Sequence, residues 1–163
     1  MANAHRATTG ANELRRLSLG MIALSFIQYL LGMALNLFVV ITRHHPGTHG
    51  SDYFSRAFQS VLWAISHGGL LAFHVGVGIL LFLGSVRLAV ATFTAHGPRV
   101  RTAGVLGALA VLGAGFNGAS FLSFNENFSS MIMASAFAVA VLSYSWIVYR
   151  TAAPVAEGPA SAS

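Results

Sequence analysis

The sequence predicts an all-α membrane protein, a bundle of four transmembrane helices. Of its 163 residues, 55% are hydrophobic and only 8% are charged, and the mean hydropathy is +0.69. A soluble domain carries about 25% charged residues, so this chain lacks the polar surface that contact with water requires. The apolar residues also gather into four long blocks separated by polar segments, which is the pattern of helices that cross a bilayer.

The first elements are a polar N-terminal segment, residues 1–16, and an apolar block over residues 17–42. This block is longer than the ~7–15 residues of a signal-peptide core, and no small-x-small cleavage pattern follows it. We therefore expect residues 17–42 to form a retained transmembrane helix, preceded by a short cytoplasmic segment.

A turn-rich loop, residues 43–56, leads to the second predicted helix, residues 57–86. Pro46 and Gly47 mark the loop because both residue types interrupt regular structure. About 20 residues cross the ~30 Å hydrocarbon core, so the second helix should tilt or project beyond the membrane.

The second half of the chain repeats this plan with shorter connections. The Gly97–Pro98 pair predicts a loop before the third helix, residues 102–122, and a polar turn separates that helix from the fourth, residues 130–149. The tail, residues 151–163, is small, polar and Pro-bearing, and is predicted to be a disordered cytoplasmic segment. The membrane domain therefore covers residues 17–150, with no separate soluble domain.

The arginines predict the orientation in the membrane. All nine basic residues are arginines. Seven fall on the side of the termini and two on the other side; in that order they are Arg6, Arg15, Arg16, Arg87, Arg99, Arg101, Arg150, and then Arg43 and Arg56. Because positive residues collect in cytoplasmic loops, both termini are expected in the cytoplasm of a multi-pass plasma-membrane protein. Arginines at helix ends do not indicate nucleic-acid binding.

A faint internal repeat in the sequence bears on how the predicted helices are arranged. Residues 31–36 and 112–117 share the pattern LGxxxN near the outer ends of the first and third predicted helices. A true duplication would make the bundle two like-oriented helical hairpins related by an axis along the membrane normal. Coincidence in a low-complexity apolar sequence is the other interpretation.

A lane of polar side chains is predicted inside the membrane. Its members are Gln28, Asn36, His67, His74 and Asn117. Polar groups in hydrocarbon need partners and therefore tend to face the bundle interior. The two histidines are seven residues apart, which would place them on one helix face about 10 Å apart. The lane predicts either hydrogen bonds between helices or a ligand or solute path.

Histidine also raises the question of a cofactor. A b-type haem needs two axial ligands, and the other three predicted helices contain no histidine. Met131, Met133 or a second subunit would have to supply the partner ligand. No cofactor is therefore the first expectation, with haem b as an alternative.

The outer loop holds a second candidate site. His44, His45, His49 and Asp52 lie within nine residues. Imidazoles with a carboxylate suit Zn²⁺ or Cu²⁺. A solvated turn without metal is the competing interpretation.

Part of the sequence resembles a known group of proteins. Residues 35–74, with LNLFVVI, HPG, WAISHGG and FHVG, and residues 117–122, NGASFL, are similar to small four-helix membrane proteins of high-GC bacteria that carry no assigned function. The resemblance covers roughly the first three helices. It implies the four-helix fold and no active-site residue.

Known catalytic motifs are missing from the sequence. No P-loop, GxGxxG, HExxH, GxSxG or CxxC pattern occurs, so enzymatic activity is not expected. The predicted role is that of an accessory or assembly partner that acts through helix–helix contacts, in a homo-oligomer or a larger membrane complex. The alternatives are a haem- or metal-binding protein and a small oligomeric permease.

Overall fold

The computed structural model describes residues 2–41, 45, 48–49, 51–95, 97–124 and 127–152. Five helices follow one another along the chain: α1 (Ala2–Phe38), α2 (Tyr53–Ser66), α3 (Gly69–Ala95), α4 (Pro98–Phe124) and α5 (Asn127–Arg150). The described residues contain no strand. Four helices, all except α2, are long and apolar enough to cross a membrane. The predicted all-α fold with four spans is therefore confirmed.

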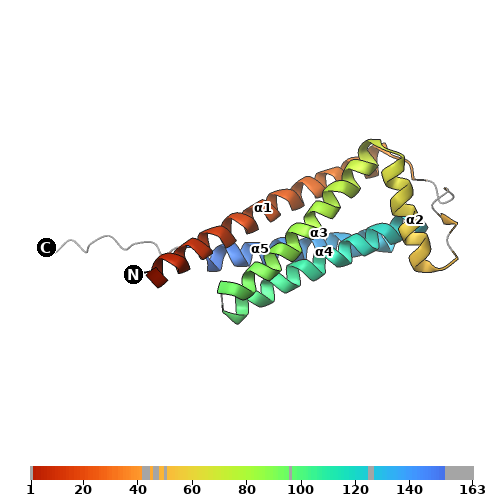
Figure 1. The fold of residues 1–163 in the computed structure, drawn as a ribbon. Coiled ribbons are helices and arrows are strands. Elements are labelled where there is room, and N and C mark those ends of the chain that lie inside the picture. Colours follow the sequence, from red (N-terminus) through yellow and green to blue (C-terminus); the bar gives the residue numbers. More distant parts are fainter. Residues whose placement is uncertain are drawn as a thin grey trace.

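The four long helices form a closed ring. α1 packs against α3 and α5, and α4 packs against the same two helices. α1 and α4 run in one direction and α3 and α5 in the other, which is the order of two like-oriented hairpins (Figure 1). α1 begins, α5 ends and α3 turns into α4 at one end of the bundle, here named the terminal end. The opposite end is named the α2 end.

Helix α2 lies crosswise at the α2 end, packed on α3 and α4 (Figure 1). Its inner face consists of small residues, Ala57, Ser60 and Ala64, and the Ser123 hydroxyl of α4 donates a hydrogen bond to the Ser60 hydroxyl at 3.1 Å. Its 14 residues measure about 21 Å, too short to cross the hydrocarbon core.

The opposite face of α2 is apolar and exposed. Phe54, Phe58, Leu62 and Ile65 recur there at intervals of three or four residues. The Phe54 ring lies 6.0 Å from the Phe116 ring, two turns before the end of α4. This combination of a packed face and an exposed apolar face is typical of helices that lie in the membrane interface.

The second predicted helix, residues 57–86, is wrong as a single element. The chain breaks between α2 and α3 at Gly68 and Gly69, whose φ angles are +70° and +64°. Glycine adopts this left-handed conformation without the steric cost that a Cβ atom brings. The membrane-crossing helix is α3, which starts at Gly69 and continues nine residues beyond the predicted end. Both halves are apolar, so composition alone concealed the break.

The N-terminal segment also differs from the prediction. The prediction began the first helix at residue 17, whereas residues 2–16 are also helical and form the first part of α1. Leu14 is buried in the bundle core, so packing extends the helix beyond the apolar block. The other predicted boundaries, 102–122 and 130–149, fall within four residues of the ends of α4 and α5.

The core of the bundle consists of close contacts between helices, as the packing of α1 on α3 shows. The inward face of α1 repeats every three or four residues as Leu14, Ser18, Met21, Ser25, Gln28, Gly32 and Leu35, none of which is exposed. A Cβ atom at Gly84 of α3 would lie 2.6 Å from Met21 Sδ, so α1 and α3 approach as closely as glycine allows. Small residues at such crossings are how membrane helices gain packing contacts.

Candidate functional site

The most specific polar contact inside the bundle joins α1 to α3. Gln28 Nε2 lies 3.1 Å from His74 Nε2, between residues 46 positions apart in the chain. With the amide nitrogen donating, the imidazole accepts at Nε2 and carries its proton at Nδ1. The pair is therefore a neutral hydrogen bond within the membrane-spanning segments.

Two glycines make room for this pair. A Cβ atom at Gly32 of α1 would lie 3.4 Å from His74 Cε1, and one at Gly78 of α3 would lie 3.2 Å from Gln28 Nε2. Each polar side chain thus lies over a glycine of the facing helix. The arrangement is reciprocal, and it places both side chains between closely packed helices.

The pair keeps unused hydrogen-bonding capacity. In the part of the chain that the structure describes, Gln28 Oε1 and His74 Nδ1 are buried without a hydrogen-bond partner. The same holds for the hydroxyls of Ser18 and Ser25, on the same face of α1. An acceptor and a donor left over in one buried pair are suited to a small polar molecule, because buried polar groups are normally satisfied by protein or water.

The structure brings together two of the five predicted lane residues, Gln28 and His74. Asn36 is exposed near the end of α1, and Asn117 Nδ2 donates to the Gly113 carbonyl of its own helix at 2.8 Å. His67 is the C-terminal capping residue of α2, and its exposed ring lies 4.3 Å from the Trp63 ring. The prediction that both histidines share one helix face is wrong, because the chain turns between them.

Buried hydroxyl residues toward the terminal end were missed by the sequence reasoning. Ser85 and Thr92 of α3 are fully buried and donate to the carbonyls of Phe82 and Ala89 at 2.7 and 2.6 Å. A sequence signal for them exists: Ser18 and Ser25 are seven residues apart, and so are Ser85 and Thr92. Seven-residue spacing keeps a residue type on one helix face.

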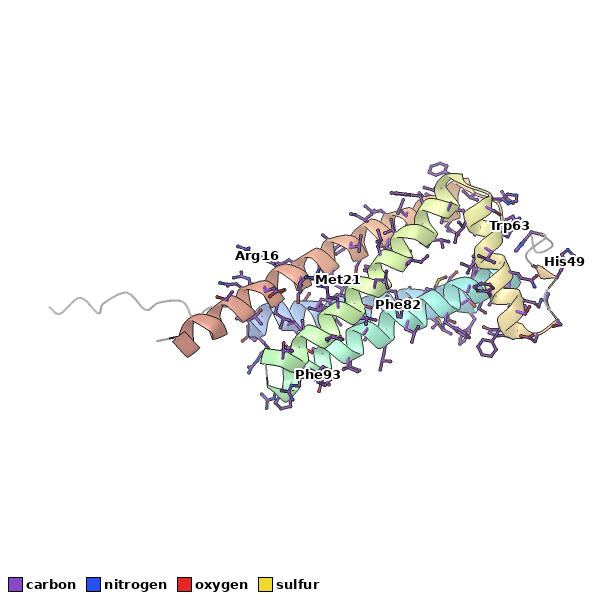
Figure 2. All side chains as sticks on the ribbon, in the orientation of Figure 1. Arg16, Met21, His49, Trp63, Phe82 and Phe93 are labelled. Atoms are coloured by element: carbon purple, nitrogen blue, oxygen red, sulfur yellow. The ribbon has the colours of Figure 1, made fainter. Side chains whose placement is uncertain are left out.

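The outer-loop histidines have different positions. His45 is buried; its Nε2 donates to the Leu122 carbonyl at 2.8 Å, and its ring stacks on Trp63 at 4.0 Å. It therefore ties the loop to α4 and α2. Trp63 and the exposed His49 both lie at the α2 end, as Figure 2 shows.

Asp52 has a structural role that the metal hypothesis did not anticipate. Its side chain accepts a hydrogen bond from the Ser55 backbone N–H at 2.9 Å and caps the N-terminus of α2. His44 lies outside the described residues. Among the described side chains, no three or more His, Cys, Asp or Glu residues come together as a metal site would require. The predicted Zn²⁺ or Cu²⁺ site stays a prediction.

The four long apolar helices define the class of this protein, integral membrane proteins with four transmembrane helices. No protein-family model, curated protein or solved structure matches the chain. Fold class alone assigns no activity, so any function has to be argued from the surfaces and sites of this molecule.

Proposed function

We propose that the protein acts within the bilayer as a helix–helix partner, and that α5 docks against a second copy of the chain. The supporting observation is the outward face of α5. Ala134, Ser135 and Ala138 are all exposed there, in the middle of a membrane-spanning segment.

This face differs from the rest of the lateral surface. Elsewhere the exposed residues of the spans are mainly large; Leu30, Leu80 and Leu109 are each more than half exposed. Lipid chains need no small residues to pack against, whereas a second helix approaches closely only where side chains are short. Ala134 and Ala138 form the small-xxx-small spacing of such contacts.

The bundle also favours partners in the membrane plane over partners in water. The apolar windows of the four spans bury only 17–22% of their residues inside the bundle, so the remaining residues are half-buried or exposed on the lateral surface. Two residues connect α2 to α3, α3 to α4 and α4 to α5, and fourteen lie between α1 and α2. A larger membrane complex would use the same lateral surface, with a different protein on α5.

The chain contains no cysteine, so an introduced thiol is unique. We expect Ala138→Cys in native membranes to give a covalent dimer with a short bis-maleimide. Leu80→Cys is the matched control: Leu80 is exposed on α3 and lies eleven residues from the α2 end of its helix, as Ala138 does on α5.

The docking proposal requires that Ala138→Cys gives clearly more crosslinked dimer than Leu80→Cys. Equal crosslinking of both would indicate random collision, and no dimer from Ala138→Cys would exclude a second copy on α5. A further variant, Ala138→Leu, fills the face with a large side chain and should convert the dimer to monomer in mass measurements in detergent.

The orientation in the plasma membrane, with both termini cytoplasmic, belongs to this proposal. The described side chains of Arg15, Arg16, Arg87, Arg99, Arg101 and Arg150 lie on segments at the terminal end. Among the described arginine side chains, Arg56 alone belongs to the α2 end. By the positive-inside rule, this distribution supports a cytoplasmic terminal end. A cytoplasm-specific reporter fused after Ser163 should be active, and one fused within the loop before α2 should not.

A further inference from the structure

A groove at the terminal end runs along α1 toward α3 and has a volume of about 570 Å³. Its lining changes in character along the helix. The first residues are polar, namely Thr9, Asn12, Glu13 and Arg16, joined by Arg87 of α3. The later ones, Leu17, Met21 and Leu24, are apolar. In Figure 2, Arg16 and Met21 follow one another along α1 in this order.

The middle of the groove is open because of Gly20. No atom lies within 4 Å of the position that a Cβ atom on Gly20 would take. A leucine or phenylalanine at this position would fill the space between the polar and the apolar part. The lining residues of α1, from Thr9 to Leu24, extend about 22 Å along the helix, so the groove can hold a molecule that has one polar end and one apolar end.

The depth of the two arginines fits the headgroup region. About 20 helical residues cross the hydrocarbon core. Counted from the α2 end, 20 residues of α1 reach from Phe38 to Leu19, and 20 residues of α3 reach from Gly69 to Leu88. Arg16 lies three residues beyond the end of the first stretch, and Arg87 is the last residue but one of the second. Both arginines therefore lie at the edge of the hydrocarbon core that this count defines.

The register of the two helices shows that the two arginines lie at a similar height along the bundle. Gly84 faces Met21, and the helices run antiparallel, so Arg87 lies opposite residue 18. Arg16 is two residues away from that position, or about 3 Å along the axis. The two guanidinium groups thus border the groove at nearly the same depth.

Arg16 is exposed, and the ion pair of Arg87 leaves guanidinium donors for a ligand. The contact between Arg87 and Glu13 measures 3.9 Å, and the two side chains are 69% and 66% exposed. An exposed ion pair of this kind contributes about 0–1 kcal/mol, so it is readily exchanged for a stronger partner. Guanidinium binds phosphate through two parallel hydrogen bonds, which makes arginine well suited to phosphate recognition.

We propose that this groove binds an anionic phospholipid. The phosphate lies between Arg16 and Arg87, and one acyl chain follows Leu17, Met21 and Leu24 toward the bilayer centre. Basic pockets between transmembrane helices are a known setting for anionic headgroups. This binding site is separate from the α5 face and does not depend on the proposed docking of a second copy.

The test is lipid binding to the purified, detergent-solubilised full chain, measured by native mass spectrometry and by the thermal shift of unfolding. The probes are dioleoyl phosphatidylglycerol, dioleoyl phosphatidylcholine and inorganic phosphate. We expect phosphatidylglycerol to bind and to raise the unfolding temperature, and the other two probes to have little effect.

Three variants locate the binding. The double variant R16Q/R87Q should weaken phosphatidylglycerol binding about tenfold, which corresponds to about 1.4 kcal/mol. The control R99Q/R101Q removes the same charge at the same end but outside the groove, and should bind as the parent does. Gly20→Leu keeps every charge and fills the open space, and should also weaken binding.

Several results would overturn the proposal. Equal loss in R16Q/R87Q and R99Q/R101Q would indicate diffuse attraction to the basic end of the bundle. An equal effect of inorganic phosphate would indicate an anion site without the acyl chain, and equal binding of phosphatidylcholine would remove the requirement for net negative charge. Undiminished binding by Gly20→Leu would exclude the groove itself.

Discussion

Replacing Gly107 of α4 by alanine tests the close packing of the bundle. A Cβ atom at this position would overlap the ring of Tyr144 of α5, with the Cδ1 and Cζ atoms at 3.1 Å and Cε1 nearer still. Tyr144 is fully buried, so its rigid ring has little room to move. Overpacking of this kind costs about 1–3 kcal/mol.

A second effect of the substitution has the opposite sign. Alanine is a better helix former than glycine by about 1 kcal/mol. Gly113→Ala on the same helix receives this gain alone, because no atom lies within 4 Å of its Cβ position. We expect Gly113→Ala to leave the free energy of unfolding unchanged or slightly raised and Gly107→Ala to lower it, with a difference of about 2 kcal/mol between them.

The assay is unfolding of the detergent-solubilised protein by titration with sodium dodecyl sulfate, followed by circular dichroism. Tyr144→Leu provides the internal check, since it removes the ring that the new methyl group meets. In that background Gly107→Ala should no longer destabilise, which gives a coupling energy of about 1–3 kcal/mol. Equal stability of Gly107→Ala and Gly113→Ala would refute the packing of α4 on α5 described above.

Three further experiments test individual contacts in the same assay. A double-mutant cycle of Gln28→Leu and His74→Ala should give a coupling of about 0.6 kcal/mol, the average for hydrogen bonds between membrane helices; additive effects would show that the two side chains do not interact. Asp52→Ala removes the cap of α2 and should cost about 1 kcal/mol, whereas an unchanged stability would mean that the cap is not formed. Gly69→Ala forces a Cβ atom into the left-handed region and should cost about 1–2 kcal/mol, while Gly76→Ala, in open helix, should cost nothing; if both behave alike, the break between α2 and α3 is not as described.

The membrane spans were predictable from the sequence because lipid imposes a simple requirement. A crossing helix needs about 20 apolar residues, and the blocks at 102–122 and 130–149 satisfied it with boundaries close to those of α4 and α5. The break at Gly68 and Gly69 was not predictable in the same way. Two adjacent glycines are also common inside membrane helices, and only the backbone angles separate a turn from a packing site.

The interior of the bundle was predictable only in part, because helix rotation is set by tertiary packing. Gln28 and His74 were identified as lane residues, and they form a hydrogen bond. Asn36 and Asn117 are equally polar, yet one is exposed and the other bonds to its own helix. Distance from the helix end does not separate these cases, because His74 lies five residues from the start of α3 and Asn117 seven residues from the end of α4. The direction in which each side chain points, which packing sets, decides whether it meets another helix or bonds to its own.

The glycines that face another helix predict which pairs of positions vary together among relatives of this protein. A Cβ atom on each would meet a side chain of the facing helix, in the pairs Gly32 and His74, Gly78 and Gln28, Gly84 and Met21, Gly104 and Thr92, and Gly107 and Tyr144; at Gly104 it would also lie 3.3 Å from Ala89 Cα. In the sequences of relatives, a larger residue in place of one of these glycines should therefore be accompanied by a smaller residue opposite. Gly113 and Gly115, which face open space, should vary independently. Because each pair joins two helices, correlated substitutions in an alignment would then identify which helices are neighbours without a structure.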